Sequence, residues 1–386
     1  MVKNRRVKHF FILVLVGCAI YVLFGVFYTP SKGSTVLAKH VDSEDTITDL
    51  YKYNAIKSKT IPVKFDQRKK CLEGTNNCIR VFDTSVDYSS AKQIYTCVDL
   101  RIRSLAHTPI CVYDPATDIY VSNSILNTGS WEHSYVLKVL DILSQDPNLE
   151  FVDLGCNVGV FTVAVAKHGR RVTALDANRK NLEMLTTSLK LGNITKMVTV
   201  VWNALSDIPE TVGFKEAEGN IGGLQMVSDI NAGNVNDDNG SIAIMLDDLI
   251  PMFRGKSVFI KMDIEAYELK AMLGGKKFFE EVDIKFLFME WIHHKHTDIG
   301  SKIVQFMTER GYTPFRPSDN FLSRPLQITY RNNWPSDIIW IKDFSKTFSK
   351  RKTVSVVKAA VMMAIFAIVA VDFVFVLGVL VVIFTQ

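Results

Sequence analysis

The residues with the clearest chemical pattern lie between Phe151 and Asp176, in the stretch FVDLGCNVGVFTVAVAKHGRRVTALD. Gly155 and Gly159 bracket a turn between an apolar strand pattern and an apolar helical pattern. Glycine permits the backbone angles of a sharp turn and lets a ligand approach closely, and the following helix N-terminus favours negative groups. Asp176 closes a second strand pattern, where a carboxylate can accept hydrogen bonds from ribose hydroxyls. This pattern predicts a cofactor that contains a nucleoside.

The glycine spacing narrows the choice of cofactor. Asn157 occupies the third position of a possible G-x-G-x-x-G fingerprint, so the dinucleotide motif fails, and the turn carries no G-K-[ST] that would make it a P-loop. The segment D-L-G-C-N-V-G, from Asp153 to Gly159, resembles the first motif of class I methyltransferases that use S-adenosylmethionine. An ordinary βαβ turn of some other α/β protein is the alternative.

Further polar side chains stand at the ends of other predicted strands. Asn203 lies near the end of one apolar run, Asp263 and Glu265 end another, and Glu290 ends a third, which His293 and His294 follow. Ligands of open α/β sheets bind beyond the carboxyl ends of the strands. Acids at so many strand ends are costly in a plain core and are more natural around a cation such as a sulfonium.

Later motifs point to one family. The segment IKMDIEAYELKAMLGG, Ile260–Gly275, resembles the K-x-D-x-E-G-x-E box of FkbM-type methyltransferases, with Ala266 in place of the usual glycine. That departure would tighten the turn after Glu265 without removing a polar group. The resemblance covers about residues 120–343, and WEH with an N-terminal anchor resembles the animal membrane-anchored branch. The supporting motifs are WEH at 131–133, NALSD at 203–207 and GNIGGLQ at 219–225.

The resemblance implies a role for each site residue. Asp176 would bind the ribose hydroxyls, Asn203 and Ala204 would lie by the adenine, and Glu132 would reach the amino end of the cofactor. The full cofactor set is Glu132, Asp153, Gly155, Asn157, Gly159, Asp176 and Asn203. The catalytic candidates are Asp263, Glu265 and His293. The alternatives are a helix cap for Asp176, a solvated turn for Asp263 and Glu265, and a polar loop for His293, His294 and His296.

Methyl transfer is an in-line displacement, so alignment of donor and acceptor supplies much of the rate. A hydroxyl acceptor also needs a base, for which Asp263, Glu265 or His293 could serve. Two acids alone are weak evidence for a divalent ion, and no metal is predicted. The leading interpretation is therefore an S-adenosylmethionine-dependent O-methyltransferase. A catalytically inactive cofactor- or partner-binding membrane protein of the same fold is the alternative, and the missing glycine disfavours a nicotinamide-dependent oxidoreductase.

Strand and helix patterns alternate along the chain and predict an α/β fold with a doubly wound sheet. Together with the resemblance, this indicates a Rossmann-like class I methyltransferase sheet that follows an N-terminal transmembrane anchor. The predicted strands and apolar runs are 151–154, 172–175, 197–205, 241–250, 257–263, 285–291 and 336–341. The predicted helices are 158–166, 179–191, 266–273 and 299–310, with an inserted hairpin at 206–227. Residues following Glu132 form a further amphipathic helix expected to pack on the sheet.

The ends of the chain indicate a membrane protein. Of 386 residues with a net charge of +5, the first nine include Lys3, Arg5, Arg6 and Lys8, directly before the uncharged run Phe10–Tyr28. This order predicts a single-pass type II anchor with the catalytic domain in the lumen of the Golgi or endoplasmic reticulum; a cleaved signal peptide is the alternative. The predicted parts are a cytoplasmic tail 1–9, an anchor 10–28, a stem and Cys-containing segment 29–117, a methyltransferase domain 118–345 and a hydrophobic segment 354–384.

The last segment, interrupted by Asp372, leaves three readings open: a second transmembrane helix, a tail removed on lipid anchoring, or an incorrect gene model. The mildly acidic body between the basic ends disfavours nucleic acid as a partner. The expected partner is a hydroxyl-bearing substrate such as a glycan.

Cysteine usage agrees with a lumenal body. Cys71, Cys78, Cys97 and Cys111 cluster after the predicted anchor and indicate two disulfides of open connectivity, whereas Cys156 should stay free. Zinc is disfavoured because no C-x-x-C pair occurs.

Overall fold

The structure is a computed structural model that describes residues 65–66, 71–72, 77–88, 95–103, 105–215, 225–227, 240–317 and 324–344. All of them belong to one compact unit, 60–386. The predicted anchor at 10–28 and the hydrophobic segment at 354–384 lie outside these residues. Among the residues that are described, no helix has the length and apolar character needed to cross a bilayer.

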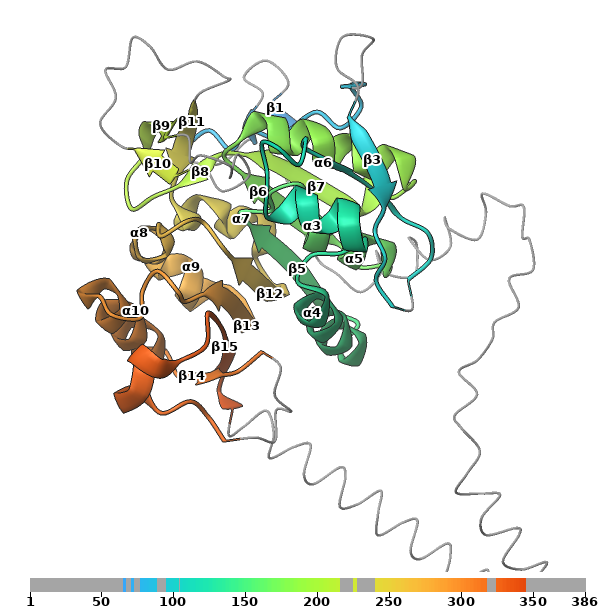
Figure 1. Cartoon of the computed structure of the whole chain (residues 1–386). Coiled ribbons are helices and arrows are strands. Elements are labelled where there is room, and N and C mark those ends of the chain that lie inside the picture. Colours follow the sequence, from blue (N-terminus) through green and yellow to red (C-terminus); the bar gives the residue numbers. More distant parts are fainter. Residues whose placement is uncertain are drawn as a thin grey trace, which may run out of the picture. The chain divides into compact units, whose positions relative to one another are not determined.

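A seven-stranded sheet forms the centre of the fold (Figure 1). Its order is β14 (Tyr312–Phe315), β15 (Asp337–Lys342), β13 (Asp283–Glu290), β12 (Ser257–Met262), β5 (Leu149–Leu154), β6 (Val172–Asp176) and β7 (Val198–Trp202). Strands β13 through β7 run parallel, and β15 is antiparallel to both of its neighbours. The chain leaves β5 toward β6 and β7 and then returns to β12 on the other side. This reversal between β5 and β12 is the position at which open α/β sheets bind ligands.

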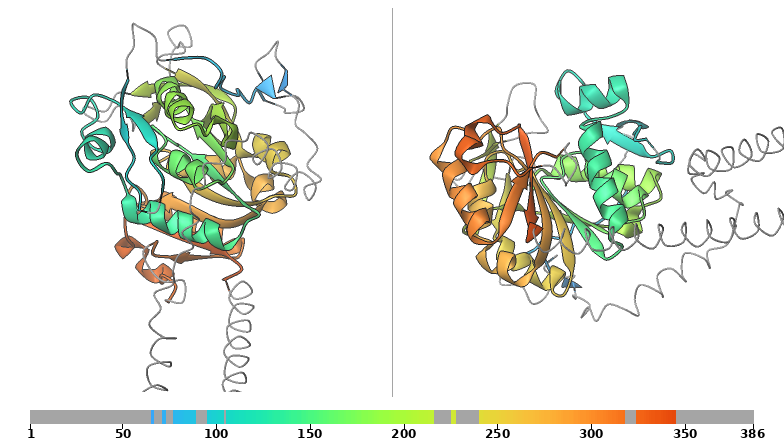
Figure 2. Two further views of the ribbon diagram at one scale, coloured as in Figure 1. Left: turned by 90° about the vertical axis from the view of Figure 1, so that its right-hand side faces the viewer. Right: turned by 90° about the horizontal axis from the view of Figure 1, so that it is seen from below.

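Helices cover both faces of the sheet (Figures 1 and 2), as a doubly wound fold requires. One face packs against α4 (His133–Gln145), α5 (Val160–Lys167) and α6 (Arg179–Leu191). The other packs against α7 (Ile250–Phe253), α8 (Glu268–Leu273), α9 (Lys276–Glu281) and α10 (Asp298–Glu309). Because side chains alternate along a strand, Phe151 enters the first core and its neighbour Val152 enters the second. The predicted doubly wound sheet is confirmed.

A second, four-stranded sheet has the order β10 (Gln225–Val227), β9 (Glu210–Lys215), β11 (Gly240–Ile244) and β8 (Ala204–Leu205). The antiparallel pair β9–β10 confirms the hairpin predicted at 206–227. The single strand predicted at 197–205 is wrong, since Asn203 divides it into β7 and β8. The apolar run 241–250 is likewise divided, into β11, the 3-10 helix η2 (Leu246–Leu249) and the start of α7.

The N-terminal part of the described chain adds two short hairpins, β1 (Phe65–Asp66) with β2 (Cys71–Leu72) and β3 (Thr96–Asp99) with β4 (Pro109–Val112). Helix α3 (Val121–Thr128) follows, and the remaining short elements are η1 (Thr195–Met197) and η3 (Ile328–Asn333). Cys97 and Cys111 form a disulfide between β3 and β4. Cys78 is also disulfide-bonded, and Cys156 is free and buried, as predicted.

The segment 77–82 lies along the outer edge of β7. The amide of Phe82 donates to the carbonyl of Val200 over 2.8 Å, and the amide of Trp202 donates to the carbonyl of Arg80 over 2.8 Å. Val81 forms an antiparallel bridge with Val201. This segment therefore continues the sheet by a short stretch beyond β7.

Candidate active site

A cavity of about 390 Å³ opens at the carboxyl ends of the strands, where the order of the sheet reverses. The loops that follow β5, β6, β12 and β13 contribute to its wall. The predicted site residues that line it are Glu132, Gly155, Asn157, Gly159, Asp176, Asn203, Asp263, Glu265 and His293. The fold thus brings together side chains that are up to 161 positions apart along the chain. Asp153 is the predicted site residue that does not line the cavity.

The loop between β5 and α5 is held by close backbone packing. Gly155 has φ +79°, and a Cβ atom there would lie 1.8 Å from the carbonyl oxygen of Asp263. Gly159 has φ +94°, and a Cβ atom there would lie 2.4 Å from Cδ1 of Leu185. Gly155 therefore requires glycine for backbone angle and for space, and Gly159 requires it for its backbone angle. The close approach of Gly155 to the carbonyl of Asp263 places the predicted cofactor loop directly against the loop that carries the predicted catalytic acids.

Asp176 organises the same loop from the end of β6. Its Oδ2 accepts a hydrogen bond from the amide of Asn157 over 2.7 Å, and its Oδ1 accepts from the amide of Asn178 and from Nδ2 of Asn181. Burial raises the pKa of Asp176 to about 6, although these hydrogen bonds favour the ionised form. The N-cap of α6 is Asn178, whose side chain accepts from the amide of Lys180. Asp176 is therefore not the capping residue of that helix.

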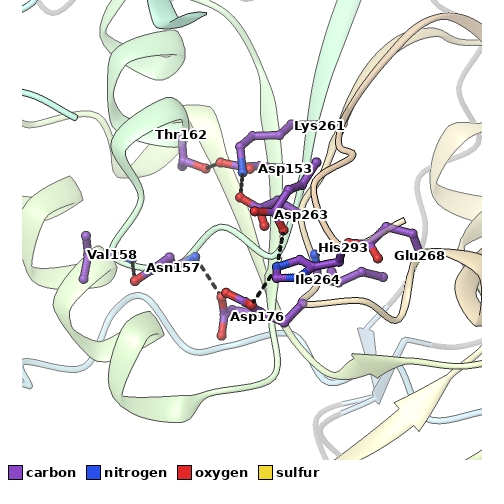
Figure 3. Close-up of polar contacts among 12 residues, drawn as sticks. Asp153, Asn157, Val158, Thr162, Asp176, Lys261, Asp263, Ile264, Glu268 and His293 are labelled. Carbon is purple, nitrogen blue, oxygen red and sulfur yellow. Dashed lines mark hydrogen bonds and ion pairs between the residues drawn. The ribbon is translucent and has the colours of Figure 1, made fainter. Parts of the chain in front are cut away.

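Asp153 lies behind the cavity and is 1% exposed. The Thr162 hydroxyl donates to its Oδ2 over 2.6 Å, whereas its Oδ1 has no hydrogen-bond partner (Figure 3). Burial raises the pKa of this carboxyl, while the nearby Lys261 opposes the shift. From this position Asp153 bonds to Thr162 of α5 and interacts electrostatically with Lys261.

Lys261 is the cation at the centre of these acids, and it was not predicted as a site residue. Its Nζ lies 2.8 Å from Oδ2 of Asp263 (Figure 3), and the residue is 6% exposed. Burial disfavours the charged ammonium, but Asp263, Asp153 and Glu132 outweigh that effect and raise the pKa of Lys261. The lysine is therefore a fixed positive charge in the wall of the cavity.

Glu132 occupies the N-cap position of α4 with φ +47°, a conformation that is uncommon for a residue with a side chain. Burial raises the pKa of Glu132 to about 7, with Asp263, Asp337 and Asp153 contributing and Lys261 opposing. Asp337, the first residue of β15, also has a pKa raised by burial, to about 6. The role of Glu132 at the amino end of the cofactor stays a prediction.

Asn203 is fully buried, and its side chain joins three segments of backbone. Nδ2 donates to the carbonyls of Cys78 and Ile242 over 3.2 and 3.1 Å, and Oδ1 accepts from the amide of Arg80 over 2.8 Å. These bonds explain why β7 and β8 are separate strands. Both Asn203 and Ala204 line the cavity, and their predicted place beside the adenine stays a prediction.

Three further polar groups line the cavity on the side of β12 and β13. Burial, together with Asp263 and Glu268, raises the pKa of Glu265 to about 7. Burial and the charges of Asp263 and Glu265 raise the pKa of Glu290 to about 9. His293 Nε2 lies 3.3 Å from Oε2 of Glu290 and 4.0 Å from Oε2 of Glu265. Glu265 therefore belongs to a convergent group in a partly enclosed cavity rather than to a fully solvated turn.

A buried pair fixes the two loops that carry this group. His294 Nε2 lies 2.8 Å from Oε2 of Glu268, and both side chains are 1% exposed. Glu268 Oε1 also accepts from the amide of Ile264, in the loop after β12. His294 does not line the cavity, and neither does the exposed His296.

Some of these residues were absent from the predicted site. Lys261 and Glu268 stand inside the motif quoted above, at the K and the final E, and that spacing was the signal that could have identified them. Glu290 was recognised as a strand end but given no role. Asp337 carries no local sequence signal, because its position depends on β15 being antiparallel to β13.

Comparison with known proteins identifies the domain. Residues 153–314 match the family model described as the Methyltransferase FkbM domain. A search of curated proteins found no match. The chain therefore carries a methyltransferase domain of the kind that depends on S-adenosylmethionine, as the resemblance implied. The seven-stranded, mostly parallel sheet is the Rossmann-like arrangement expected for it.

Several solved structures resemble the fold distantly. An S-adenosylmethionine-dependent O-methyltransferase from Thermotoga maritima is 10% identical, covering 65% of this chain and 79% of that one, with a TM-score of 0.30. The tRNA (uracil-54, C5)-methyltransferase of Pyrococcus abyssi, in complex with S-adenosyl-L-homocysteine, is 13% identical over 55% of this chain and 38% of that one, with a TM-score of 0.30. The precorrin-6y C5,15-methyltransferase of Geobacter metallireducens is 13% identical over 47% and 72%, with a TM-score of 0.27. Because these scores are low, the family model alone identifies the domain.

Proposed function

We propose that the FkbM-type, S-adenosylmethionine-dependent methyltransferase domain of this chain methylates a hydroxyl group, such as that of a glycan, inside the secretory pathway. The observation that carries the proposal is the position of Glu265. Its carboxyl lines the same cavity as the Gly155–Gly159 turn and Asp176, and its pKa is about 7. A base of that strength suits the removal of a hydroxyl proton near neutral pH.

The chain's own residues fit the implied cofactor. A cavity of about 390 Å³ is within the usual range for small-molecule sites. Glu132, Asp176 and Asp263 place carboxyl groups in its wall, and their ionised forms complement the sulfonium of S-adenosylmethionine. When bound, that cofactor supplies an electrophilic methyl group. Asp176 would accept hydrogen bonds from the ribose hydroxyls, and the backbone of the Gly155–Gly159 turn would be accessible to the methionine part of the cofactor.

The acids after β12 have different environments and therefore different proposed roles. Asp263 is paired with Lys261, so one of its oxygens is committed to holding the ammonium in place. Among the residues that the structure describes, no lysine pairs with Glu265, which instead converges with Glu290 and His293. We assign proton removal from the acceptor to Glu265, and electrostatic positioning beside the methyl group to Asp263.

A lumenal location is part of the proposal. The disulfide between Cys97 and Cys111, together with the disulfide-bonded Cys78, supports an oxidising compartment. The basic residues 1–9 and the uncharged run 10–28 support a type II anchor that would leave the catalytic domain in the lumen.

The full-length chain in detergent micelles provides the test. Methyl transfer from radiolabelled S-adenosylmethionine would be measured over panels of glycans, lipids, small hydroxyl compounds, amines and thiols. We expect transfer to a hydroxyl, with Glu265→Gln losing about 10²–10⁴-fold in turnover while calorimetry shows nearly unchanged cofactor affinity. His296→Ala is the matched control and should turn over at the wild-type rate. Transfer restricted to amines or thiols would contradict the hydroxyl acceptor, and a fully active Glu265→Gln would contradict the assigned base.

A further inference from the structure

Glu265, Glu290 and His293 present ligand atoms to one point in the cavity. One atom from each side chain can be chosen so that all lie within 4.8 Å of one another. Glu290 is the last residue of β13, His293 follows it, and Glu265 comes from the loop after β12. Two carboxylates and an imidazole from separate segments thus converge, although they are not neighbours along the chain.

The contacts inside this group leave it incompletely satisfied. Glu290 Oε2 is shielded from solvent and has no hydrogen-bond partner among the residues that the structure describes. His293 Nε2 is 3.3 Å from that oxygen, but the two atoms do not form a hydrogen bond of acceptable geometry. A buried carboxylate oxygen without a donor is costly unless a cation compensates it.

Two neighbouring basic side chains are engaged with other acids. Lys261 contacts Asp263 over 2.8 Å, and His294 contacts Glu268 over 2.8 Å. Among the described residues, the basic group that faces both Glu265 and Glu290 is His293, at 4.0 and 3.3 Å, and it belongs to the same cluster. The sulfonium of the cofactor could approach the two carboxyl groups, but it offers nothing that an imidazole nitrogen can bind. A metal ion binds carboxylate oxygen and imidazole nitrogen together.

A buried pair of side chains lies behind the proposed ligands. The buried Glu268–His294 pair joins the loop after β12 to the loop after β13, and Glu268 also accepts from the amide of Ile264. Partners of this kind, one step behind the ligands, hold a metal site in its geometry. Glu268 comes three residues after Glu265, and His294 directly follows His293, so the pair joins the two segments that carry these ligands.

From these observations we propose that Glu265, Glu290 and His293 bind a divalent metal ion that coordinates the acceptor hydroxyl. The proposal rests on the function proposed above and specifies how the same site activates the acceptor. Two carboxylates with one imidazole suit Mn²⁺, Fe²⁺ or Zn²⁺ better than a site of oxygens alone would. Three protein ligands leave coordination positions for the acceptor oxygen and water.

The reaction balances in a single displacement. Coordination to the ion lowers the pKa of the acceptor hydroxyl, and its proton passes to the non-coordinating oxygen of Glu265. The acceptor oxygen forms a bond to the methyl carbon as the bond from that carbon to sulfur breaks. The electron pair of the broken bond remains on sulfur, which gives S-adenosylhomocysteine and the methyl ether. Glu265 then returns its proton to solvent.

The decisive measurement is metal binding without cofactor or acceptor. The full-length chain in micelles would be stripped with a chelator, freed of it, and titrated with Mn²⁺ alone, followed by electron paramagnetic resonance, with Zn²⁺ as competitor. We expect one saturable site per chain. Three variants, Glu265→Gln, Glu290→Gln and His293→Ala, should each lower the affinity for Mn²⁺ by at least about 10–100-fold, which is the loss typical of removing a residue that only supports a metal ligand. The controls His296→Ala and Glu281→Gln, at exposed positions that do not line the cavity, should bind Mn²⁺ as the wild type does.

The outcomes separate the two proposals. Absence of saturable Mn²⁺ or Zn²⁺ binding, or binding that persists in the triple variant, would overturn the metal site and leave the hydroxyl acceptor untouched. Conversely, a chain that binds Mn²⁺ through these residues but methylates only amines or thiols would retain the site and lose the hydroxyl. Chelation should also abolish most hydroxyl methylation and Mn²⁺ should restore it; equal activity in a chelator would refute the coordination of the acceptor. Calorimetry with S-adenosylmethionine would verify that each variant is folded.

Discussion

Replacing Lys261 with methionine should destabilise the domain strongly, because the substitution removes the positive charge. Methionine keeps nearly the same side-chain length, so the effect reports the charge rather than the packing. Lys261 lies 2.8 Å from Asp263 and is the cation that Asp153 and Glu132 share. Removing one partner of a buried ion pair typically costs about 3–5 kcal/mol, since the remaining charge stays buried. Asp263 is 35% exposed, so water relieves part of that cost and the lower end, about 3 kcal/mol, is expected.

The assay is thermal unfolding of the full-length chain, followed by circular dichroism at pH 7.5. For a domain of 150–250 residues each kcal/mol shifts Tm by about 2–4 °C, so a fall of about 6–12 °C is expected. The matched control is Lys256→Met. Lys256 lies 3.0 Å from Glu150, but both side chains of that pair are 23% exposed, and such pairs contribute about 0–1 kcal/mol.

The pH dependence provides a second readout. Without Lys261, the pKa values of Asp153 and Glu132, already raised by burial, should rise further in the folded state. The folded variant then binds more protons than the unfolded chain as the pH falls from about 7 to 5, so its deficit in stability should shrink over that range. A Tm within about 2 °C of the Lys256→Met control, or a deficit that grows on acidification, would refute the central role of Lys261.

Three further predictions concern the cofactor loop and the topology. Asp176→Ala should weaken S-adenosylmethionine binding, since loss of a hydrogen bond to a charged group typically costs about 1.5–3 kcal/mol. Burial raises the pKa of Asp176 to about 6, so the affinity of the wild type in calorimetry should also fall as the pH drops through 6. Asp176→Asn cannot ionise at this position and should lack that step. Gly155→Ala should lower Tm and turnover much more than Gly169→Ala. Both glycines have positive φ, but a Cβ atom at Gly155 would lie 1.8 Å from a backbone oxygen, whereas a Cβ atom at Gly169 would meet no described atom within 4 Å. Equal effects of the two substitutions would mean that the backbone angle, and not the close packing, causes the loss. Asn193 is exposed and begins the sequon N-I-T, so Asn193→Gln should remove one glycan from the protein made in cells, as seen by electrophoresis with and without glycosidase treatment. The domain should also resist added protease in intact microsomes. Digestion from the cytosolic side would contradict the lumenal position of the domain.

The fold was largely predictable because its central strands are buried on both faces. Such strands are continuous apolar runs, and 151–154, 172–175, 257–263 and 285–291 correspond to β5, β6, β12 and β13. The prediction failed at Asn203, where a buried amide satisfies three backbone groups that are distant in sequence. The short strand β14 was missed because its four residues, with Pro314 among them, carry no clear alternation.

The site was predictable where it depends on positions at the ends of strands. Gly155, Asp176 and Glu265 follow that rule, and all line the cavity. What the pattern could not supply was the charge balance. Lys261 stands near the carboxyl end of the apolar strand β12, and its charge is shared with Asp263 and with acids from other segments. The packed structure shows which carboxylate the lysine contacts directly.

The short segment 77–82 has a consequence for how this domain can be produced. It pairs with β7 through Val81 and Val201 and through the amides of Phe82 and Trp202. A recombinant chain that began at residue 118, the predicted start of the domain, would lose this cover and present β7 as an open edge. Unpaired edge strands are templates for pairing between molecules. Such a truncated chain should accumulate as insoluble aggregate, whereas one that retains the segment should keep the edge closed.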